Sequence, residues 1–195
     1  MIGERLAAAS VGVAGAGGLG SNCAVALARA GVGRIVVADF DEVSESNLDR
    51  QYFFRDQVGE KKVYALEANI ARIDPKISVE AHDERLDPDS VVRLFSGCDA
   101  VVEALDDPEA KRMIAEAVLS RMPGTPLVMG SGLAGWGANN RLRTRRSGDL
   151  FVCGDEAAAV SGSRPPMAPR VGVVACMQAN QVLEILLGED TGGGE

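Results

Sequence analysis

Four glycines within six residues constrain the fold of this chain more than any other feature: Gly15-Ala16-Gly17-Gly18-Leu19-Gly20 fits the pattern G-x-G-x-x-G. Residues 10–14 before it have the composition of a short buried strand, and residues 19–30 after it have helical spacing up to Gly31, which can end a helix. Glycine permits a tight turn and lets the backbone approach a phosphate, while the helix start offers exposed N–H groups. The pattern predicts a nucleotide-binding turn without distinguishing a dinucleotide from ATP.

Strands and helices alternate along the rest of the sequence. Strands are expected at residues 34–38, 77–81, 99–104 and 126–129. Helices are expected at residues 60–73, from 87 onward, at 107–121 and at 171–187. Extended hairpin-like chain is expected at 132–146, a mobile crossover loop at 154–166 and a frayed tail at 191–195. This order predicts one α/β domain over residues 1–195. Its core would be a Rossmann-like, mainly parallel sheet with helices on both faces, followed by a C-terminal hairpin-like extension and a last helix.

The composition argues against several classes of partner. A formal net charge of −8 repels phosphate backbones, so we expect no nucleic-acid partner. The uncharged run of residues 6–28 is long enough to span a membrane, but its five glycines and Asn22 make it too weakly apolar, so we expect no membrane association. The four cysteines form no C-x-x-C pair, which argues against structural zinc and favours a reduced, cytoplasmic location.

A carboxylate, Asp39, ends the second expected strand. At that place in a nucleotide-binding fold a carboxylate can accept hydrogen bonds from ribose hydroxyls, while Gly17 and Gly18 approach the phosphates. The alternative is a plain turn between strand and helix with an exposed aspartate.

The polar segment after Asp39 carries the most specific pattern. Residues 39–51 are D-F-D-E-V-S-E-S-N-L-D-R-Q and residues 58–63 are V-G-E-K-K-V. They resemble the ThiF/MoeB/HesA family, relatives of the ubiquitin-activating enzymes, with its D-x-D-x-V-x-x-S-N-L-x-R-Q and V-G-x-x-K-V patterns. The resemblance continues at residues 103–107 and 167–171 and covers essentially the whole chain. The short length, together with residues 103–107 and 151–155, is most similar to the compact ThiF-type branch of thiamin biosynthesis.

This resemblance implies an activity and a set of site residues. The activity is ATP-dependent adenylylation of the C-terminal Gly-Gly carboxylate of a small ubiquitin-like, ThiS-like sulfur-carrier protein, with release of pyrophosphate. By resemblance, Asn47 and Arg50 contact the phosphates, Lys62 follows on the next helix, Asp39 holds the ribose, and Asp106 organises magnesium or the reacting carboxylate. The resemblance also implies a homodimer, for which the apolar last helix offers packing material at Val171, Val174, Leu183 and Leu186.

The proposed chemistry explains these residue types. A carboxylate that attacks the α-phosphorus of ATP approaches a polyanion, so fixed cations such as Arg50 and Lys62, usually with magnesium, must neutralise charge. Asp106 is a hard oxygen ligand of the kind that magnesium with bound phosphates uses. No general base is needed, because the nucleophile is already an anion at neutral pH.

Several of these residues have a structural alternative. Arg50 could form a surface ion pair, and Lys62 could be a solvated helix residue. Asp107 before Pro108 is expected to be a helix N-cap without a catalytic role. His82 follows a strand and is interpreted as structural or solvated.

Three arginines, Arg141, Arg143 and Arg145, alternate along an extended segment and would share one face. They could guide an acidic carrier tail or the ATP phosphates, or they could protect a sheet edge with charge.

The chain departs from the family pattern in its cysteines and at its N-terminus. Many relatives carry two C-x-x-C pairs for zinc or a crossover-loop cysteine that links to the carrier, and this chain has neither. Cys153 is a weak candidate for such a link, and Cys23 and Cys176 are expected in the core. Arg5 is a candidate for the arginine that related dimers donate into the neighbouring site.

Two functions from other classes remain open. A nicotinamide-dependent oxidoreductase would use the same glycine turn but leaves Asn47, Arg50 and Lys62 unexplained. A non-catalytic, adenylyltransferase-like protein that binds a partner would have little need of all these phosphate-handling residues.

Overall fold

A seven-stranded sheet in the order β3-β2-β1-β4-β5-β7-β6 organises the chain, as seen in a computed structural model in which residues 1–157 and 161–188 are described. The strands are β1 (Ser10–Ala14), β2 (Arg34–Ala38), β3 (Ser78–His82), β4 (Ala100–Glu103), β5 (Leu127–Ser131), β6 (Arg143–Ser147) and β7 (Leu150–Gly154). The α-helices are α1 (Ile2–Ala8), α2 (Gly18–Ala30), α3 (Lys62–Ala71), α4 (Pro88–Phe95), α5 (Pro108–Arg121) and α6 (Ala168–Leu187). Short 3-10 helices are η1 (Glu45–Asn47), η2 (Arg55–Gln57) and η3 (Asn139–Arg141).

The sheet is parallel except at one edge. Strands β1 to β5 and β7 run in the same direction, and β6 pairs antiparallel with β7. The predicted mainly parallel, Rossmann-like sheet is therefore confirmed. The strand order reverses between β1 and β4, so this fold has its topological switch point at the carboxyl end of β1.

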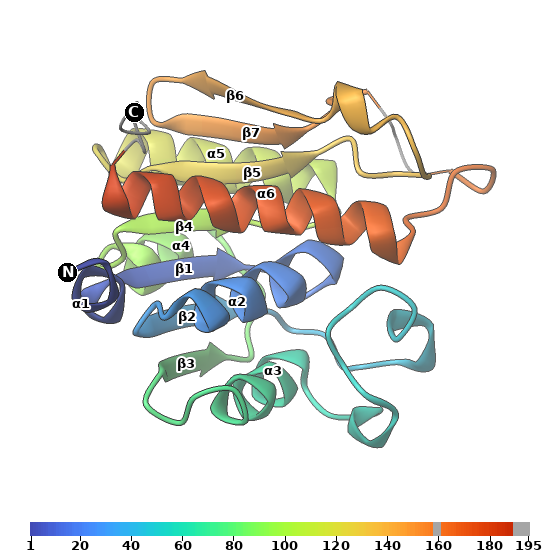
Figure 1. Cartoon of the computed structure of the whole chain (residues 1–195), viewed down its shortest axis with the longest axis horizontal. Helices are drawn as coiled ribbons and strands as arrows, with labels where there is room; N and C mark the ends of the chain where they lie inside the picture. The colour runs from blue at the N-terminus through green and yellow to red at the C-terminus, as the bar shows by residue number, and fades with distance from the viewer. Residues whose placement is uncertain (158–160, 189–195) are drawn as a thin grey trace, which may run out of the picture.

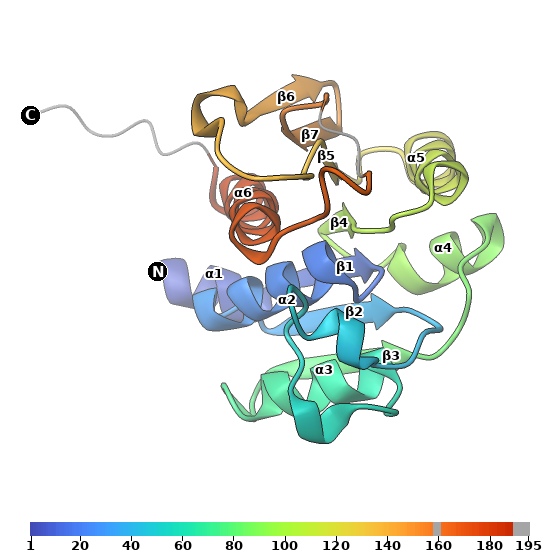
Figure 2. The ribbon, with the colours of Figure 1, turned by 90° about the vertical axis from the view of Figure 1, so that its right-hand side faces the viewer.

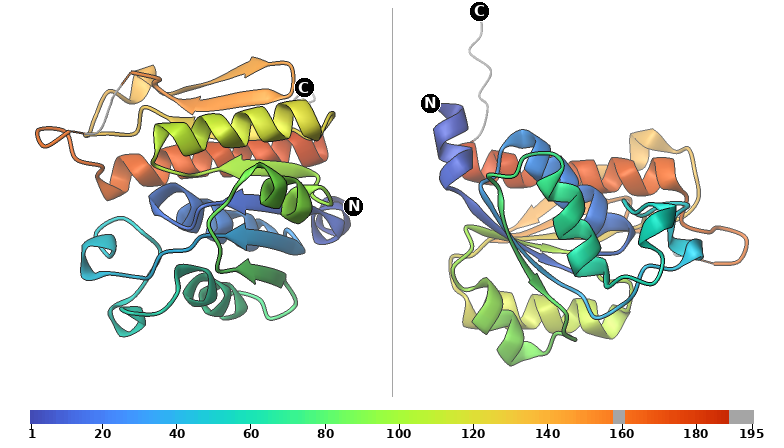
Figure 3. Two further views of the ribbon diagram at one scale, coloured as in Figure 1. Left: turned by 180° about the vertical axis from the view of Figure 1, so that it is seen from behind. Right: turned by 90° about the horizontal axis from the view of Figure 1, so that it is seen from below.

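Helices cover both faces of the sheet (Figures 1 and 3). Alternate residues of one strand face opposite layers, because side chains alternate along a strand: in β2, Ile35 and Val37 belong to the core under α2, α3 and α6, whereas Val36 packs with α4 and α5. The sheet thus separates the two cores. The loops at its carboxyl edge belong to neither layer of helices and can form a binding site (Figure 2).

Local sequence explains where most helices begin and end. Asp87 caps α4 by accepting from the N–H groups of Asp89 (3.0 Å) and Ser90 (2.8 Å), and Pro88 occupies the first turn. Gly31 ends α2 with φ of 95°, the left-handed conformation that glycine adopts without strain. These boundaries follow the sequence-based expectations to within three residues.

The expected hairpin at residues 132–146 is placed wrongly. The observed hairpin is β6 and β7, while residues 132–142 form a loop that includes η3, because Gly132, Gly135 and Gly137 have φ values of 75°, 79° and 65° and cannot continue a strand. The sequence analysis also missed β7, which lies buried between β5 and β6, and α1. Residues 158–160 and 191–195 lie outside the described residues, so the crossover-loop and tail assignments stay predictions, as does the single-domain division.

The uncharged run of residues 6–28 folds into the core as β1 and most of α2. Among the described residues, one helix, α6, is long and apolar enough to cross a membrane by length and composition alone. It lies along α2 and contacts β4, β5 and β7, so its apolar residues have a place inside this fold (Figure 1).

We predict that Gly20→Ala destabilises the protein by about 2 kcal/mol or more, because its Cβ would overlap the carbonyl oxygen of Gly15 and the backbone must move. Gly3→Ala on α1 is the control, since nothing lies within 4 Å of its Cβ position and the change should stay within about 1 kcal/mol. The check is the urea midpoint of each variant. Equal midpoints for Gly20→Ala and wild type would contradict the close packing described here.

Candidate nucleotide site

The candidate site lies where the carboxyl ends of β1, β2 and β4 meet, at the switch point of the sheet (Figure 2). The glycine turn is packed tightly there: the Gly15 N–H donates to Ala38 O (2.8 Å), and a Cβ at Gly15 would lie 3.0 Å from Ala104 O. Helix α2 begins directly after Gly17 with no side-chain cap and no acidic residue in its first turn. Its first N–H groups are therefore available to an anion.

Asp39 connects the glycine turn to the following loop. Its Oδ2 accepts from the Ala16 N–H (2.6 Å) and its Oδ1 accepts from the Asp41 N–H (2.8 Å). Each carboxylate oxygen has a second lone pair, so these bonds are compatible with the predicted ribose contact but do not require it. The ribose role of Asp39 stays a prediction.

Lys62 is buried, so its interpretation as a solvated helix residue is wrong. The residue is 5% exposed, and its Nζ lies 2.7 Å from Asp41 Oδ2. Its backbone N–H also donates to Asp41 O (3.0 Å). A buried ammonium is costly unless it is paired, and here its carboxylate partner belongs to the same loop that Asp39 ties to the glycine turn.

The loop between β2 and α3 lies over the start of α2. Asn22 joins them, because its Nδ2 donates to Gly18 O (2.7 Å) and to Arg50 O (2.9 Å). The Cγ of Arg50 is 3.8 Å from the Cβ position of Gly18. Asn47 caps η1 through its Oδ1, which accepts from the Ser44 N–H (3.0 Å). The structure thus brings Asn47 and Arg50 to the same loop beside α2, and their phosphate contacts stay predictions.

The guanidinium of Arg50 forms local contacts in this structure. Its Nη1 donates to Asp49 Oδ1 (2.6 Å) and to Ser46 O (2.9 Å), and the side chain is one quarter exposed. The surface ion pair expected as an alternative therefore exists. It is exposed at Asp49, so solvent screens it and an anion can compete for the guanidinium.

Asp106 and Asp107 follow β4 and play different structural parts. Asp107 accepts from the Ala110 N–H (2.9 Å), so its predicted N-cap role is confirmed. Asp106 is exposed, and it forms no hydrogen bond or ion pair with residues 1–157 or 161–188. The preceding Leu105 touches the glycine turn, with its Cδ2 2.9 Å from the Cβ position of Gly15. Asp106 is thus held near the turn with its carboxylate unengaged.

Three neighbours of the site had no role in the sequence analysis: Asn22, Asp41 and Gln51. Gln51 has a buried Oε1 without a hydrogen-bond partner among the described residues, and its Nε2 lies 3.9 Å from the Cβ position of Gly17. Asp41 and Gln51 were part of the quoted patterns, but a pattern assigns no partner. Only the fold reveals which backbone each side chain contacts.

The thiols are placed differently from expectation at one position. Cys23, Cys98 and Cys153 are buried, whereas Cys176 is exposed, so its assignment to the core is wrong. Burial raises the pKa of the Cys23 thiol, and burial, partly offset by the hydrogen bond with Thr144, raises the pKa of the Cys153 thiol. Cys153 is therefore a poor nucleophile in this fold. No cluster of three or more potential metal-binding His, Cys, Asp or Glu side chains occurs among the described residues.

The arginines at the periphery serve structural contacts. Arg5 donates to Leu186 O (2.8 Å) and Leu187 O (3.1 Å), so it caps its own α6, and this contact argues against its role as a donated arginine. Arg141 lies in η3 rather than on a strand. Arg143 and Arg145 lie on one face of β6, and their Nη2 atoms lie 4.0 and 2.6 Å from the carboxylate of Glu156, which follows β7. Two of the three expected arginines are therefore together.

His82 ends β3, and its Nδ1 lies 4.0 Å from Glu84 Oε1. The side chain is 31% exposed and its Nε2 is buried without a hydrogen-bond partner among the described residues, so the structural or solvated interpretation of His82 stays a prediction.

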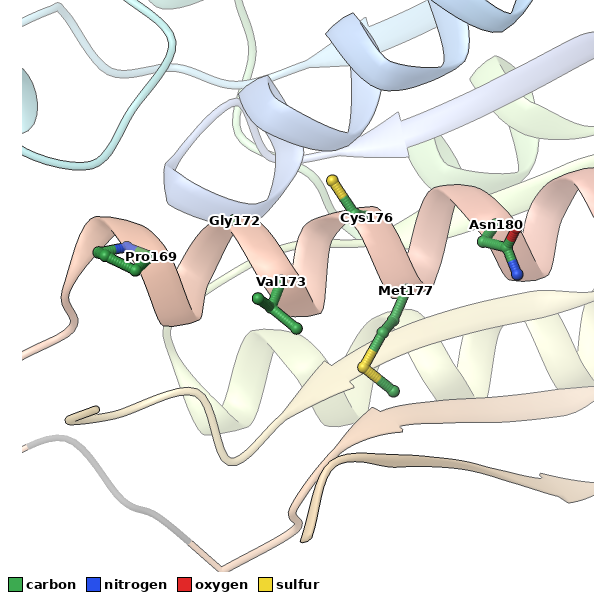
Figure 4. A pocket seen from close by; sticks show the side chains of 6 residues that line it. All are labelled: Pro169, Gly172, Val173, Cys176, Met177 and Asn180. Atoms are coloured by element: carbon green, nitrogen blue, oxygen red, sulfur yellow. The ribbon is translucent and has the colours of Figure 1, made fainter. Parts of the chain in front are cut away.

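A shallow, mainly apolar groove of about 600 Å³ runs along the exposed side of α6 (Figure 4). Its lining residues are Pro169, Gly172, Val173, Cys176, Met177 and Asn180. Val171 and Val174 instead face the core and are 1% and 0% exposed, so they cannot supply the expected dimer packing. A second cavity of about 220 Å³ lies between the 135–142 loop and the start of α6. The glycine turn lines neither of these two cavities.

The chain was compared with known proteins. A family model described as "ThiF family" matches residues 3–193. The molybdopterin-synthase adenylyltransferase of Salmonella typhimurium is 32% identical over 188 residues, which are 94% of this chain and 75% of that protein. The SAMP-activating enzyme E1 of Haloferax volcanii is 34% identical over 192 residues, covering 95% of this chain and 70% of that protein. The adenylyltransferase and sulfurtransferase MOCS3 of Anopheles gambiae is 33% identical, but this chain spans only 43% of it.

Among solved structures, the E. coli tRNA N6-threonylcarbamoyladenosine dehydratase TcdA in complex with ATP has a TM-score of 0.86 at 23% identity. The match covers 99% of this chain and 91% of that chain. At this identity the likeness concerns the fold.

From the burial of the cysteines we predict that one thiol reacts fast with a thiol reagent. In the native protein at low concentration, a thiol reagent such as DTNB should modify Cys176 at least tenfold faster than the three buried cysteines, and Cys176→Ser should remove the fast phase. Unfolding in guanidinium should expose all four thiols in the wild type. Two or more fast thiols in the native state would contradict the burial described here.

Proposed function

Because the chain belongs to the ThiF family, we propose that it is an adenylyltransferase that activates the C-terminal Gly-Gly carboxylate of a small ubiquitin-like sulfur-carrier protein with ATP. Of the three relatives above, the two that this chain covers to 70% or more of their length are named as an adenylyltransferase and as an activating enzyme. The reaction would release pyrophosphate. We expect it in the cytoplasm, where ATP is present and the free cysteines stay reduced.

One chain of contacts carries this proposal. The Ala16 N–H binds Asp39, the Asp41 N–H binds Asp39, and the Asp41 carboxylate binds Lys62. The contacts tie a buried cation to the glycine turn from which the uncapped α2 begins. A fixed ammonium and free helix N–H groups, joined by these contacts, suit the phosphates of a nucleoside triphosphate.

Each expected site residue then has a part. Gly17 and Gly18 let the phosphates approach the start of α2, Asp39 accepts from the ribose, and Asn47 binds a phosphate. Arg50 and Lys62 neutralise phosphate charge, with Arg50 leaving its exposed pair with Asp49. Asp106 has the unengaged, hard oxygen donor that suits magnesium beside phosphates. Magnesium, when bound, would neutralise charge that develops on the phosphates.

The reaction itself needs little from the protein beyond position and charge. A carboxylate oxygen of the carrier forms a bond to the α-phosphorus of ATP, and the bond from that phosphorus to the bridging oxygen of pyrophosphate breaks. The electron pair leaves with pyrophosphate, and the products are the carrier acyl-adenylate and pyrophosphate. No proton is transferred and no thiol takes part, which fits the burial of Cys153.

We further propose that the carrier is a ThiS-like protein of thiamin biosynthesis, because residues 103–107 and 151–155 are most similar to that branch of the family. The relatives above are named for other carriers, so the carrier must be tested directly. A nicotinamide-dependent oxidoreductase is disfavoured, because the buried Lys62 and the unengaged Asp106 have no part in hydride transfer. A non-catalytic partner-binding protein would bind carrier without turnover.

With magnesium, ATP and a carrier ending in Gly-Gly, labelled pyrophosphate should exchange into ATP, because adenylation is reversible. Exchange should require the carrier and should be lost when the terminal glycine of the carrier is deleted. Asp106→Asn should lower the exchange rate about a hundredfold, the cost of one electrostatic partner in the transition state. Arg50→Ala and Lys62→Ala should also weaken exchange by removing charge from the phosphates.

Matched controls lie beside each cation. Lys61→Ala removes the neighbouring lysine, whose Nζ pairs with Glu42 and Asp83 and donates to Phe40 O (3.3 Å). Arg55→Ala removes an exposed arginine of the same loop. Both controls and Cys153→Ala should keep wild-type exchange. Carrier-independent exchange with a free amino acid, or tight NAD binding without exchange, would refute the proposal.

We also propose a homodimer through the apolar groove on α6, in place of Val171 and Val174, which are buried in the core. Sedimentation at micromolar concentration should give twice the 20.4 kDa mass of one chain. Val173→Asp should shift the protein to monomer, because it buries an unpaired charge in the contact, whereas Leu119→Asp on α5 should not. A wild type that sediments only as a monomer would overturn this assembly.

A further inference from the structure

A fully buried carboxylate ends β4, directly before the turn that carries Asp106. Glu103 is 0% exposed, and Lys111 Nζ donates to both of its carboxylate oxygens at 2.9 and 2.7 Å. Glu103 Oε1 also accepts from the Leu105 N–H (2.7 Å), and Lys111 Nζ donates to Leu105 O (3.0 Å). Both backbone polar groups of Leu105 are thus bound within one ring of contacts.

This ring joins three elements. Glu103 belongs to the strand, Leu105 to the turn and Lys111 to the first turns of α5, so the entry of the chain into α5 is held from both sides. A helix on the other face of the sheet also binds the end of β4, because Gln178 Nε2 of α6 donates to the Glu103 carbonyl oxygen (2.9 Å). The Ala104 N–H donates to Ala14 O (2.9 Å), beside the glycine turn.

The packing around Glu103 does not require a charged side chain at this position. In the sheet, Glu103 lies between Ala14 of β1 and Met129 of β5, which are an apolar pair of neighbours. Burial raises the pKa of Glu103 and the contacts with Lys111 oppose this shift, so the carboxylate depends on its partner to stay ionised. A buried ion pair often gives a protein no more stability than apolar residues of the same size would. Stability alone therefore does not explain why Glu103 and Lys111 are paired here.

The geometry points to Glu103 and Lys111 as positioning residues that hold the Ala104–Leu105 backbone against the glycine turn and so fix the backbone from which Asp106 extends. Asp106 has no partner among the described residues that would fix its side chain, so its position depends on the backbone of Leu105. Neither Glu103 nor Lys111 needs to touch substrate. The inference rests on the proposed adenylyl transfer for its catalytic consequence, but not for the backbone order that it describes.

The experiment compares Lys111→Met, Lys111→Arg and Ile114→Val. Lys111→Met removes the cation and should lower kcat for carrier-dependent pyrophosphate exchange at least tenfold, with the Kd for ATP changed less than threefold. Lys111→Arg keeps the cation and should recover most of kcat. Ile114→Val removes a methyl group from the buried face of the same helix, so it should lower the thermal midpoint and leave kcat within twofold of wild type.

A double mutant tests whether the pair acts through Asp106. In an Asp106→Asn background, Lys111→Met should lower kcat by less than twofold, because the group that the ring positions is already disabled. Multiplicative losses in the double mutant, or an equal loss of kcat in Ile114→Val, would overturn the inference.

Hydrogen exchange separates this inference from the proposed function. In the protein without ligands, the Leu105 amide should be protected in wild type and should exchange at least tenfold faster in Lys111→Met, while amides of β2 are unchanged. This result is independent of adenylation: if wild type catalyses no exchange of pyrophosphate, the proposed function fails, and the hydrogen exchange still tests the ring. Unchanged protection of Leu105 would overturn the inference in either case.

Discussion

The contact on which the site depends is the close approach of α2 to the end of β1, where Gly20 lies against the carbonyl of Gly15 without room for a Cβ. This approach lets α2 start directly beneath the switch point of the sheet, with its first N–H groups unblocked. The remaining layers are built on it, because α6 lies along α2 and closes the same core. A larger residue at Gly20 would move the helix that both the site and the core require.

Three ion pairs with buried members lie at the carboxyl edge of the sheet, each with its acidic residue at or just after the end of a different parallel strand. Asp41 after β2 binds Lys62, Glu103 at the end of β4 binds Lys111, and Asp155 after β7 binds Arg170 of α6 at 2.6 Å. Arg170 also donates to Gly137 O and so ties the 132–142 loop to α6. Such pairs contribute little net stability because desolvation offsets their attraction. Their common effect is to define the conformation of loops that apolar packing leaves undetermined.

The sequence analysis predicted local features and family patterns well, and partners across the fold poorly. The glycine turn, the Asp107 cap and the parallel sheet follow from residues close together in the sequence, and the structure has all three. By contrast, Lys62 was left open between solvent and phosphate, and the structure buries it against Asp41, 21 residues away. Arg5 was considered for a neighbouring site, and it caps a helix 181 residues further on. Contacts between such distant residues are set by how the elements pack.

By itself the sequence determined the fold class and the family: glycine turns, caps and strand periodicity act over a few residues, and the pattern around Asn47, Arg50 and Lys62 resembles the family whose model matches residues 3–193. Only the tertiary structure decided which face of α6 is exposed, which cysteine can react and how the turn before Asp106 is held. A helix that is apolar almost all round does not specify its buried face, because burial depends on where α2 and the sheet lie. Likewise the charge of Glu103 acquires a role only when α5 brings Lys111 against it.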